Sequence, residues 1–148
     1  MNIKDMLFVI TGSGAGIGAG TALRAASYGA KIMLSDINDE NGQSIVESIR
    51  AKGGTAFYKH CDVTNENQVK ELMSEAQKQL GGIDVLHNNA GVHESMISED
   101  LSLDTMSLET FHKVMDINVT GSWLCAKYAL PYLRKSKYAS IINAGSTS

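Results

Sequence analysis

Two hydrophobic patterns alternate along the chain: short apolar runs, and longer stretches in which apolar residues recur every three or four positions. The short runs predict strands over residues 6–11, 31–35, 55–60, 83–87 and 140–144. The longer stretches predict helices over residues 17–29, 41–52, 65–80 and 107–135. Strands that alternate with amphipathic helices are typical of a parallel sheet with helices on both faces. The pattern therefore predicts a doubly wound α/β domain with a parallel sheet of about five strands.

Capping and glycine residues mark the expected ends of these helices. In the third predicted helix the apolar residues that share one face are Val69, Leu72, Met73, Ala76 and Leu80. Thr64 is the expected N-cap of this helix, and Gly81 is expected to end it. Gly53 ends the preceding helix in the same way. The polar stretch over residues 93–105 predicts a surface loop, and residues 107–135 predict one long helix.

The composition is that of a soluble globular domain, with 43% apolar and 20% charged residues in a chain of 148. A net charge of −3 offers no basic surface for nucleic acid. No apolar run reaches the roughly 18 residues of a membrane span, and the N-terminus lacks the apolar core of a signal peptide. Cys61 and Cys125 lie 64 residues apart, which favours free thiols in the cytoplasm over a disulfide. The four histidines show no metal-ligand spacing, so no metal site is predicted.

Small or polar residues follow every predicted strand. In chain order they are the glycine turn over residues 11–18, Asp36, Asp62-Val63, Asn88-Asn89-Ala90-Gly91 and Ser146. Ligands of open parallel sheets bind at the carboxyl ends of the strands, which lie along one edge. The sequence therefore predicts one binding site assembled from five separate segments.

The glycine turn predicts a site for the pyrophosphate of a dinucleotide. Backbone N–H groups at a helix N-terminus can approach phosphate closely only where no Cβ intervenes. Asp36 lies 20 residues beyond Gly16, the distance at which a carboxylate meets the ribose hydroxyls of the adenosine. Each signal alone has a simpler explanation, a flexible turn for the glycines and a turn-forming residue for Asp36. Together they favour a dinucleotide, and the negative charge of Asp36 favours NAD over NADP.

The motifs that follow have the order and spacing of a known family. They are Thr11-Gly-x-x-x-Gly16-Ile17-Gly18, Asp62-Val63, Asn88-Asn89-Ala90-Gly91, Asn118-Val-Thr-Gly121, and Ser140-Ile-Ile-Asn143 before Ser146. In these motifs the whole chain resembles the short-chain dehydrogenase/reductase family. The resemblance implies a Rossmann-type domain over residues 1–148 that binds NAD, with a small alcohol or ketone as its substrate.

The resemblance also implies two sets of site residues. The cofactor-binding set comprises Gly12, Ser13, Gly16, Ile17, Gly18, Asp36, Ile37, Asp62, Val63, Asn89, Ala90 and Gly91. The catalytic set comprises Asn118, as the active-site asparagine, and Ser146, as a hydrogen-bonding partner of the substrate oxygen. Without the resemblance, Asn118 is equally well explained as a structural amide, and Ser146 as an ordinary loop serine.

The family also uses a Tyr-x-x-x-Lys pair, in which the lysine lowers the pKa of the tyrosine that exchanges a proton with the substrate. None of the five tyrosines in this chain has a lysine four residues later. The expected function is therefore the N-terminal, cofactor-binding part of an NAD-dependent oxidoreductase, C-terminally truncated and without the last strands of the family fold. The alternative is a non-catalytic NAD-binding module or a truncated relic.

Self-association is expected from the surfaces that such a chain exposes. The last predicted strand becomes an edge that carries Ile141 and Ile142, and an unpaired edge is a template for a second chain. Trp123, Leu124 and Leu130 of the long helix are expected to be partly uncovered. A homo-oligomer is the predicted assembly.

Overall fold

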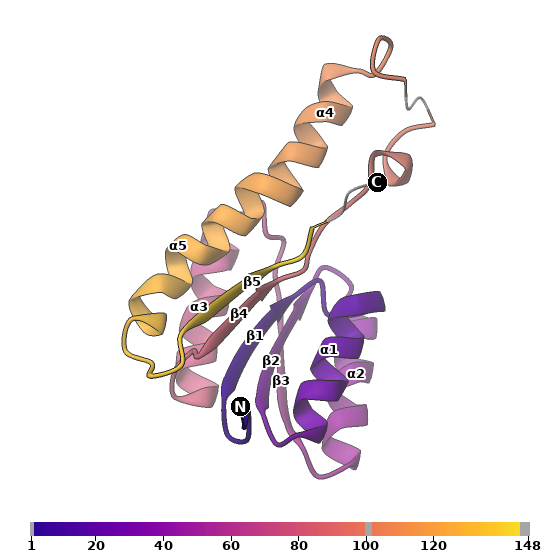
Figure 1. The fold of residues 1–148 in the computed structure, drawn as a ribbon. Coiled ribbons are helices and arrows are strands. Elements are labelled where there is room, and N and C mark those ends of the chain that lie inside the picture. The colour runs from indigo at the N-terminus through magenta and orange to yellow at the C-terminus, as the bar shows by residue number, and fades with distance from the viewer. Residues whose placement is uncertain (1, 100–101, 146–148) are drawn as a thin grey trace.

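The computed structural model describes residues 2–99 and 102–145. Its centre is a single sheet in which all neighbouring strands are parallel, in the order β3-β2-β1-β4-β5 (Figure 1). The strands are β1 (Leu7–Thr11), β2 (Lys31–Asp36), β3 (Thr55–His60), β4 (Val85–Asn88) and β5 (Ser140–Asn143). The order reverses at β1, where the chain leaves β3 at one edge and returns as β4 on the other side of β1. The prediction of a doubly wound, five-stranded parallel sheet is confirmed.

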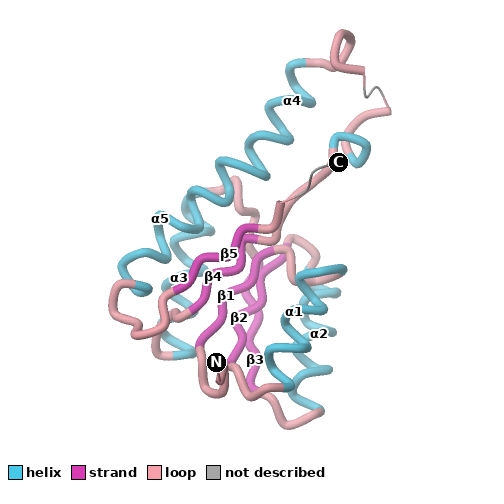
Figure 2. The backbone as a smooth tube through the Cα atoms, viewed as in Figure 1, coloured by secondary structure: helices cyan, strands magenta, loops and turns pink. Residues whose placement is uncertain are grey.

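Helices cover both faces of the sheet, as Figures 1 and 2 show. One face is covered by α1 (Gly16–Ser27) and α2 (Asp39–Ala51), and the other by α3 (Glu66–Leu80) and α5 (Ser122–Leu133). The helix α4 (Leu108–Met115) continues the line of α5 beyond the sheet (Figure 1). A short 3-10 helix, Glu94–Met96, lies within the predicted surface loop. No helix in the described part of the chain combines the length and the apolar character that a membrane crossing requires.

The alternation of side chains along the strands produces two separate hydrophobic cores. Val9 packs into the core on the side of α3 and α5, whereas Phe8 and Ile10 pack into the core on the side of α1 and α2. A strand buried on both faces reads as a continuous apolar run, which is why β1 could be recognised from the sequence. Complete burial of a side chain such as Ile10 contributes about 1.5–3 kcal/mol.

The N-cap of α3 differs from the expectation. Asn65, not Thr64, caps the helix: the Oδ1 atom of Asn65 accepts hydrogen bonds from the backbone N–H groups of Asn67 and Gln68, at 3.1 and 3.2 Å. The N–H and hydroxyl groups of Thr64 donate instead to Asp62 Oδ1, at 2.9 and 2.8 Å. Because the Asp62 carboxylate binds Thr64, the next polar residue, Asn65, caps the helix. Gly81 ends α3 in the left-handed region, with φ of 91°, as predicted.

The predicted single helix over residues 107–135 is wrong in one respect. Between α4 and α5 the backbone forms a π-helical segment, Asp116–Gly121, in which hydrogen bonds span five residues and not the four of an α-helix. Gly121 in this segment lies so close to Val63 that a Cβ atom would stand 2.6 Å from the Val63 Cγ2 atom. Insertions of this kind are frequent at functional sites, and the periodicity of apolar residues does not reveal them.

The expectation of uncovered apolar side chains is confirmed for most of the residues named. Trp123 is 58% exposed and Leu130 39%, and Ile141 and Ile142 on the edge strand β5 are 41% and 45% exposed. Leu124 is the exception, because it is only 5% exposed and packs into the core beneath α5.

Candidate functional site

A cleft of about 670 Å³ opens at the carboxyl ends of the strands. Its walls include the connections that follow β1, β2, β3 and β4, together with the end of α4 and the start of the π-helical segment. The residues that line it are Gly12, Ala15, Gly16, Asp36, Ile37, Cys61, Asp62, Val63, Thr64, Asn89, Ala90, Gly91, Val92, Met96, Lys113, Asp116 and Ile117. Nine of the twelve predicted cofactor-binding residues are among them, and Ser13, Ile17 and Gly18 are not.

The glycine turn is locked against the end of β4. Gly12 has φ of +61°, and a Cβ atom there would lie 2.7 Å from Ala90 Cα. At Gly18 a Cβ atom would lie 2.3 Å from the carbonyl oxygen of Gly12. The side-chain Nδ2 of Asn89 donates to the carbonyl oxygens of Thr11 and Gly12, at 3.1 and 2.9 Å. These contacts bring the turn after β1 and the segment after β4 together as one wall of the cleft.

The N-terminus of α1 is open toward this wall. Its N-cap, Ala15, makes no side-chain capping bond, and the first turn contains no acidic residue. By contrast, Asn38 caps α2, Asn65 caps α3 and Ser107 caps α4. The N–H groups at the start of α1 therefore point to a place where an anion is favoured by the helix dipole.

The side chains of two predicted residues near the turn do not line the cleft. Ser13 is fully buried, and its hydroxyl donates to the carbonyl oxygen of Ser35 at 3.2 Å and accepts from the Ser35 N–H at 2.9 Å. Its side chain thus ties the turn to β2 and does not line the cleft. Ile17 is 74% exposed at the start of α1.

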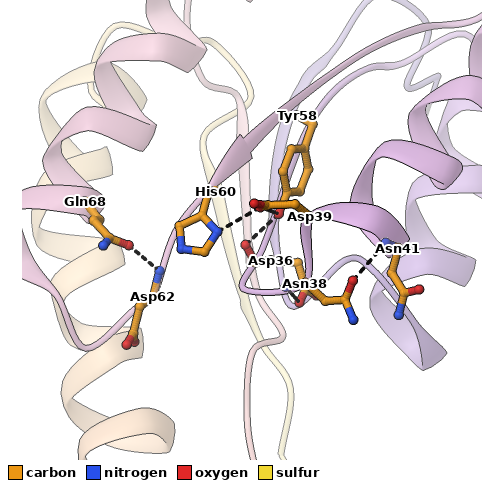
Figure 3. Close-up of polar contacts among 8 residues, drawn as sticks. All are labelled: Asp36, Asn38, Asp39, Asn41, Tyr58, His60, Asp62 and Gln68. Atoms are coloured by element: carbon orange, nitrogen blue, oxygen red, sulfur yellow. Dashed lines mark hydrogen bonds and ion pairs between the residues drawn. The ribbon is translucent and has the colours of Figure 1, made fainter.

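Asp36 lies where β2, α2 and the glycine turn meet. Its Oδ2 atom accepts a hydrogen bond from the N–H of Gly14 at 2.8 Å. Its Oδ1 atom accepts one from the N–H of Asn38 at 2.9 Å; both residues are drawn in Figure 3. Ile37, beside it, is 68% exposed and lines the same part of the cleft. The carboxylate is therefore held in one orientation at the rim of the glycine turn.

A second carboxylate, Asp62, follows β3 on the next wall. Its backbone N–H donates to Gln68 Oε1 at 2.7 Å (Figure 3), and its Oδ1 atom holds Thr64. Its Oδ2 atom has no hydrogen-bond partner among the described residues. Val63 is buried at the base of this wall. The arrangement presents one carboxylate oxygen beside an apolar floor, which suits a flat, amine-bearing ring.

Asn118 lies within the π-helical segment, next to the lining residue Ile117, and is not itself among the residues that line the cleft. Its Oδ1 atom accepts from the N–H of Val92, and its Nδ2 atom donates to the carbonyl oxygen of Val92, each at 2.8 Å. Gly91 leaves room for this amide, since a Cβ atom there would stand 3.2 Å from Asn118 Oδ1. The side chain therefore fixes the segment after β4, and its backbone carbonyl accepts from the Ser122 hydroxyl at 2.9 Å. Ser146 lies outside the described residues.

Several lining residues were not expected from the sequence. Cys61 and Thr64 flank the predicted pair Asp62-Val63 and could have been inferred from that position. Lys113 and Ile117 are four residues apart on the helical stretch that carries Asn118, so they share a face. Lys113 belongs to α4 and Ile117 to the π-helical segment, and no sequence motif placed either residue at the strand ends.

Burial shapes the chemistry of the thiols near the cleft. Both cysteines are unpaired and buried, as expected for free thiols. Burial raises the pKa of the Cys61 thiol to about 11 and that of Cys125 to about 12. Neither thiol forms a reactive thiolate near neutral pH, so the cysteine that lines the cleft acts as an apolar surface. The described residues contain no group of three or more His, Cys, Asp or Glu side chains arranged to hold a metal ion.

Comparison with known proteins agrees with this geometry. The family model described as short chain dehydrogenase matches residues 7–148, and the chain belongs to that family. It is 39% identical over 148 residues to a 2,5-dichloro-2,5-cyclohexadiene-1,4-diol dehydrogenase of Sphingobium indicum, with 99% of this chain and 56% of the relative covered.

Two plant enzymes show a similar degree of likeness. The secoisolariciresinol dehydrogenase of Forsythia intermedia is 36% identical over 146 residues, covering 99% of this chain and 51% of the relative. The (+)-borneol dehydrogenase 1 of Salvia officinalis is 35% identical over 140 residues, covering 95% of this chain and 52% of the relative. The chain spans about half the length of the curated relatives it matches.

Proposed function

We propose that the chain binds NAD in the cleft and forms the cofactor-binding part of an oxidoreductase that interconverts a secondary alcohol and a ketone. The observation that carries the proposal is the carboxylate of Asp36, held by the N–H of Gly14 at 2.8 Å beside the open N-terminus of α1. A site for an anion and a fixed carboxylate are thereby adjacent, as the pyrophosphate and the ribose of a dinucleotide require.

The residues present fit such a cofactor. The volume of about 670 Å³ falls within the range of small-molecule sites. A Cβ atom at Gly12 would collide with Ala90 in the segment after β4, and one at Gly18 would collide with the Gly12 carbonyl oxygen, so the turn can close only with glycine at both positions. Gly16, with φ of +54°, has open space where its Cβ would be, which leaves the approach to α1 clear.

Asp36 supports NAD as the preferred form. Each oxygen of its carboxylate accepts one backbone N–H group and can accept a further hydrogen bond from a ribose hydroxyl. The 2′-phosphate of NADP would place like charges together at this point, and no Lys or Arg lies among the residues of the glycine turn. We assign the adenine to the wall of Asp62 and Val63, and the nicotinamide half to the segment from Asn89 to Gly91.

For catalysis, the bound cofactor supplies hydride transfer, and the chain's own groups orient the substrate and move its proton. We assign Ser146 as a hydrogen-bonding partner of the substrate oxygen. We assign Asn118 to a proton relay; its side-chain amide is held in place by two hydrogen bonds to the backbone of Val92. A Tyr-x-x-x-Lys pair, which is not found within these 148 residues, would supply the general acid, and such a group contributes about 10²–10⁴-fold in rate. A non-catalytic NAD-binding protein is the second candidate.

The partner and location proposals follow from the same features. We infer a small alcohol or ketone as substrate, because the chain belongs to the short-chain dehydrogenase family and its relatives are named as dehydrogenases. The free buried thiols favour a cytoplasmic location. The edge strand β5 and the exposed Trp123 favour a homo-oligomer, because both leave apolar surface that a second copy would bury.

The test is calorimetric titration of the protein in its natural length with NAD and with NADP. Replacing Asp36→Asn keeps the size of the side chain and removes its charge. Loss of hydrogen bonds to a charged group should lower the preference for NAD by about 10–100-fold. The exposed Glu71→Gln, on α3 and paired with Lys59 at 3.0 Å, is the matched control and should leave the preference unchanged. Failure of the wild-type protein to bind NAD overturns the proposal.

A turnover assay on the same samples separates the two candidates. Reduction of NAD in the presence of secondary alcohols identifies an oxidoreductase, and NAD binding without turnover over a broad set of alcohols identifies the non-catalytic protein. The intact mass of the protein from its host, compared with 15.9 kDa, gives the length of chain to which the result applies.

A further inference from the structure

Three titratable side chains gather behind the turn that carries Asp36, outside the cleft itself. Tyr58 and His60 come from β3, and Asp39 is the first residue of α2 (Figure 3). The Tyr58 hydroxyl lies 2.7 Å from the backbone carbonyl oxygen of Asp36 and 2.7 Å from Asp39 Oδ1. His60 Nδ1 lies 2.8 Å from the same Asp39 oxygen. The hydroxyl therefore lies between the last residue of β2 and the first residue of α2, and its single proton is shared between these two acceptors.

The position of Tyr58 is built into the fold. Its ring lies against Gly42 of α2, where a Cβ atom would stand 2.1 Å from Tyr58 Cε2. Only glycine at this point allows the ring to lie between β3 and α2 with its hydroxyl at the turn. Burial and the hydrogen bond to Asp39 raise the pKa of Tyr58, so the hydroxyl stays protonated and remains a donor. Hydrogen bonds from Tyr58 and His60 lower the pKa of Asp39, so its carboxylate stays charged.

The Tyr58 hydroxyl controls a turn of two residues, Ile37 and Asn38. Asn38 donates its N–H to Asp36 Oδ1 at 2.9 Å and caps α2 by accepting from the N–H of Asn41 at 3.0 Å. Movement of this turn therefore moves the donor that orients the Asp36 carboxylate. Ile37, between them, lines the cleft. The conformation of the turn and the direction of the carboxylate are coupled through Asn38.

We propose that Tyr58 is a positioning residue for cofactor preference, whose hydroxyl clamps the turn after β2 and holds the Asp36 carboxylate at the adenosine end of the cleft. The inference rests on the NAD site proposed above and adds a residue that does not touch the cofactor. The Tyr58→Phe variant also separates the effect of the position of the Asp36 carboxylate from the effect of its charge. Tyr58→Phe leaves the charges of Asp36 and Asp39 in place, so any loss of discrimination arises from where the Asp36 carboxylate points.

Tyr58→Phe should perturb the fold little, because each oxygen atom near the Tyr58 hydroxyl keeps a second hydrogen-bonding partner. The Asp36 carbonyl oxygen also accepts from the N–H of Cys61 at 3.1 Å, and Asp39 also accepts from His60. Tyr58→Phe should therefore fold and melt nearly as the wild type does. The matched control is Tyr128→Phe, which also removes a hydroxyl bonded to a carboxylate, Glu66, on the opposite face of the sheet.

The experiment measures the dissociation constants of NAD and NADP by calorimetry for the protein in its natural length. In Tyr58→Phe we expect the ratio of the NADP constant to the NAD constant to fall about five-fold, the weight of one hydrogen bond. In Tyr128→Phe the ratio should not change. Within an Asp36→Asn background, Tyr58→Phe should produce no further change, because the two residues act through one carboxylate.

The outcomes distinguish this inference from the proposed function. If the wild type prefers NAD and Asp36→Asn removes the preference, an unchanged ratio in Tyr58→Phe overturns the role of Tyr58 alone. An equal effect of Tyr58→Phe with and without Asp36 also overturns it, because the hydroxyl would then act by another route. Absence of NAD binding in the wild type overturns the proposed site and this inference together.

Discussion

Two glycines of α1, Gly18 and Gly20, provide a matched pair for testing how tightly the glycine turn is packed. In a helix, replacing glycine by alanine ordinarily stabilises a protein by about 0.5–1 kcal/mol. Gly20 has no neighbour within 4 Å of the position that a Cβ would take, so Gly20→Ala should show this ordinary gain. Gly18 differs, since its Cβ would lie 2.3 Å from the Gly12 carbonyl oxygen and 2.5 Å from Asn89 Nδ2.

The magnitude at Gly18 follows from that overlap. A carbon and a carbonyl oxygen in contact are normally about 3.3–3.6 Å apart, so the backbone of Gly12 or the helix must shift by about 1 Å. Overpacking of this kind costs about 1–3 kcal/mol, and here the neighbour is backbone that Asn89 holds in place. Because the gain in helix propensity is common to both variants, Gly18→Ala should be less stable than Gly20→Ala by the overpacking cost, about 1–3 kcal/mol.

Thermal and urea unfolding of the two variants and the wild type provide the assay. For a chain of this length, 1 kcal/mol corresponds to about 2–4 °C in Tm. Gly20→Ala should melt slightly above the wild type, and Gly18→Ala should melt several degrees below Gly20→Ala. Equal melting temperatures for the two variants would refute the reasoning, because the close approach of α1 to the turn would then have no energetic consequence.

Two further predictions concern groups outside the cleft. Asp84 accepts the N–H of Leu7 at 2.9 Å and the hydroxyl of Ser136, so Asp84→Ala should lower the free energy of unfolding by about 1–3 kcal/mol in urea, and Asp84→Asn by less. Burial lowers the pKa of His87 below its ordinary 6.5, so the unfolded chain takes up this proton first. The stability that depends on neutral His87 should be complete above about pH 6.5 and fall as the pH drops through the lower folded-state pKa. Urea titrations across this range should show a smaller decline for His87→Gln, and an equal decline in both proteins would contradict the assignment.

Much of the fold followed from local pattern. The five strands and the ends of α2 and α3 were predictable because apolar runs, helical periodicity and positive-φ glycines are properties of short segments. Expectations failed where two local solutions competed. At the start of α3, Thr64 and Asn65 are both good caps, and the contact of Thr64 with Asp62 decided between them. The π-helical segment of Asn118 is another case, since its sequence is compatible with an ordinary helix.

The candidate site was likewise predictable from the sequence only in part. Its position at the strand ends and most of its lining residues were predictable, because parallel strands bring their carboxyl ends to one edge. The partners of its side chains were not. Ser13 was expected to face the cofactor, yet its hydroxyl bonds to Ser35, and the amide of Asn118 is used by Val92. Lys113 also lines the cleft, and no sequence motif predicted this.

The amino-acid sequence by itself determined the family, the order of strands and helices, and the edge of the sheet where a ligand would bind. The strands and helices depend on composition and spacing within segments of about ten residues, where the chain's own geometry governs. The family depends on the order and spacing of motifs along the whole chain. Only the tertiary structure decided which groups meet across 20 to nearly 80 residues: Asp36 with Gly14, Tyr58 with the Asp36 carbonyl, and Asn89 with the glycine turn. The physical reason is that a hydrogen bond requires atoms within about 3 Å and in line, and strand order and register set that placement.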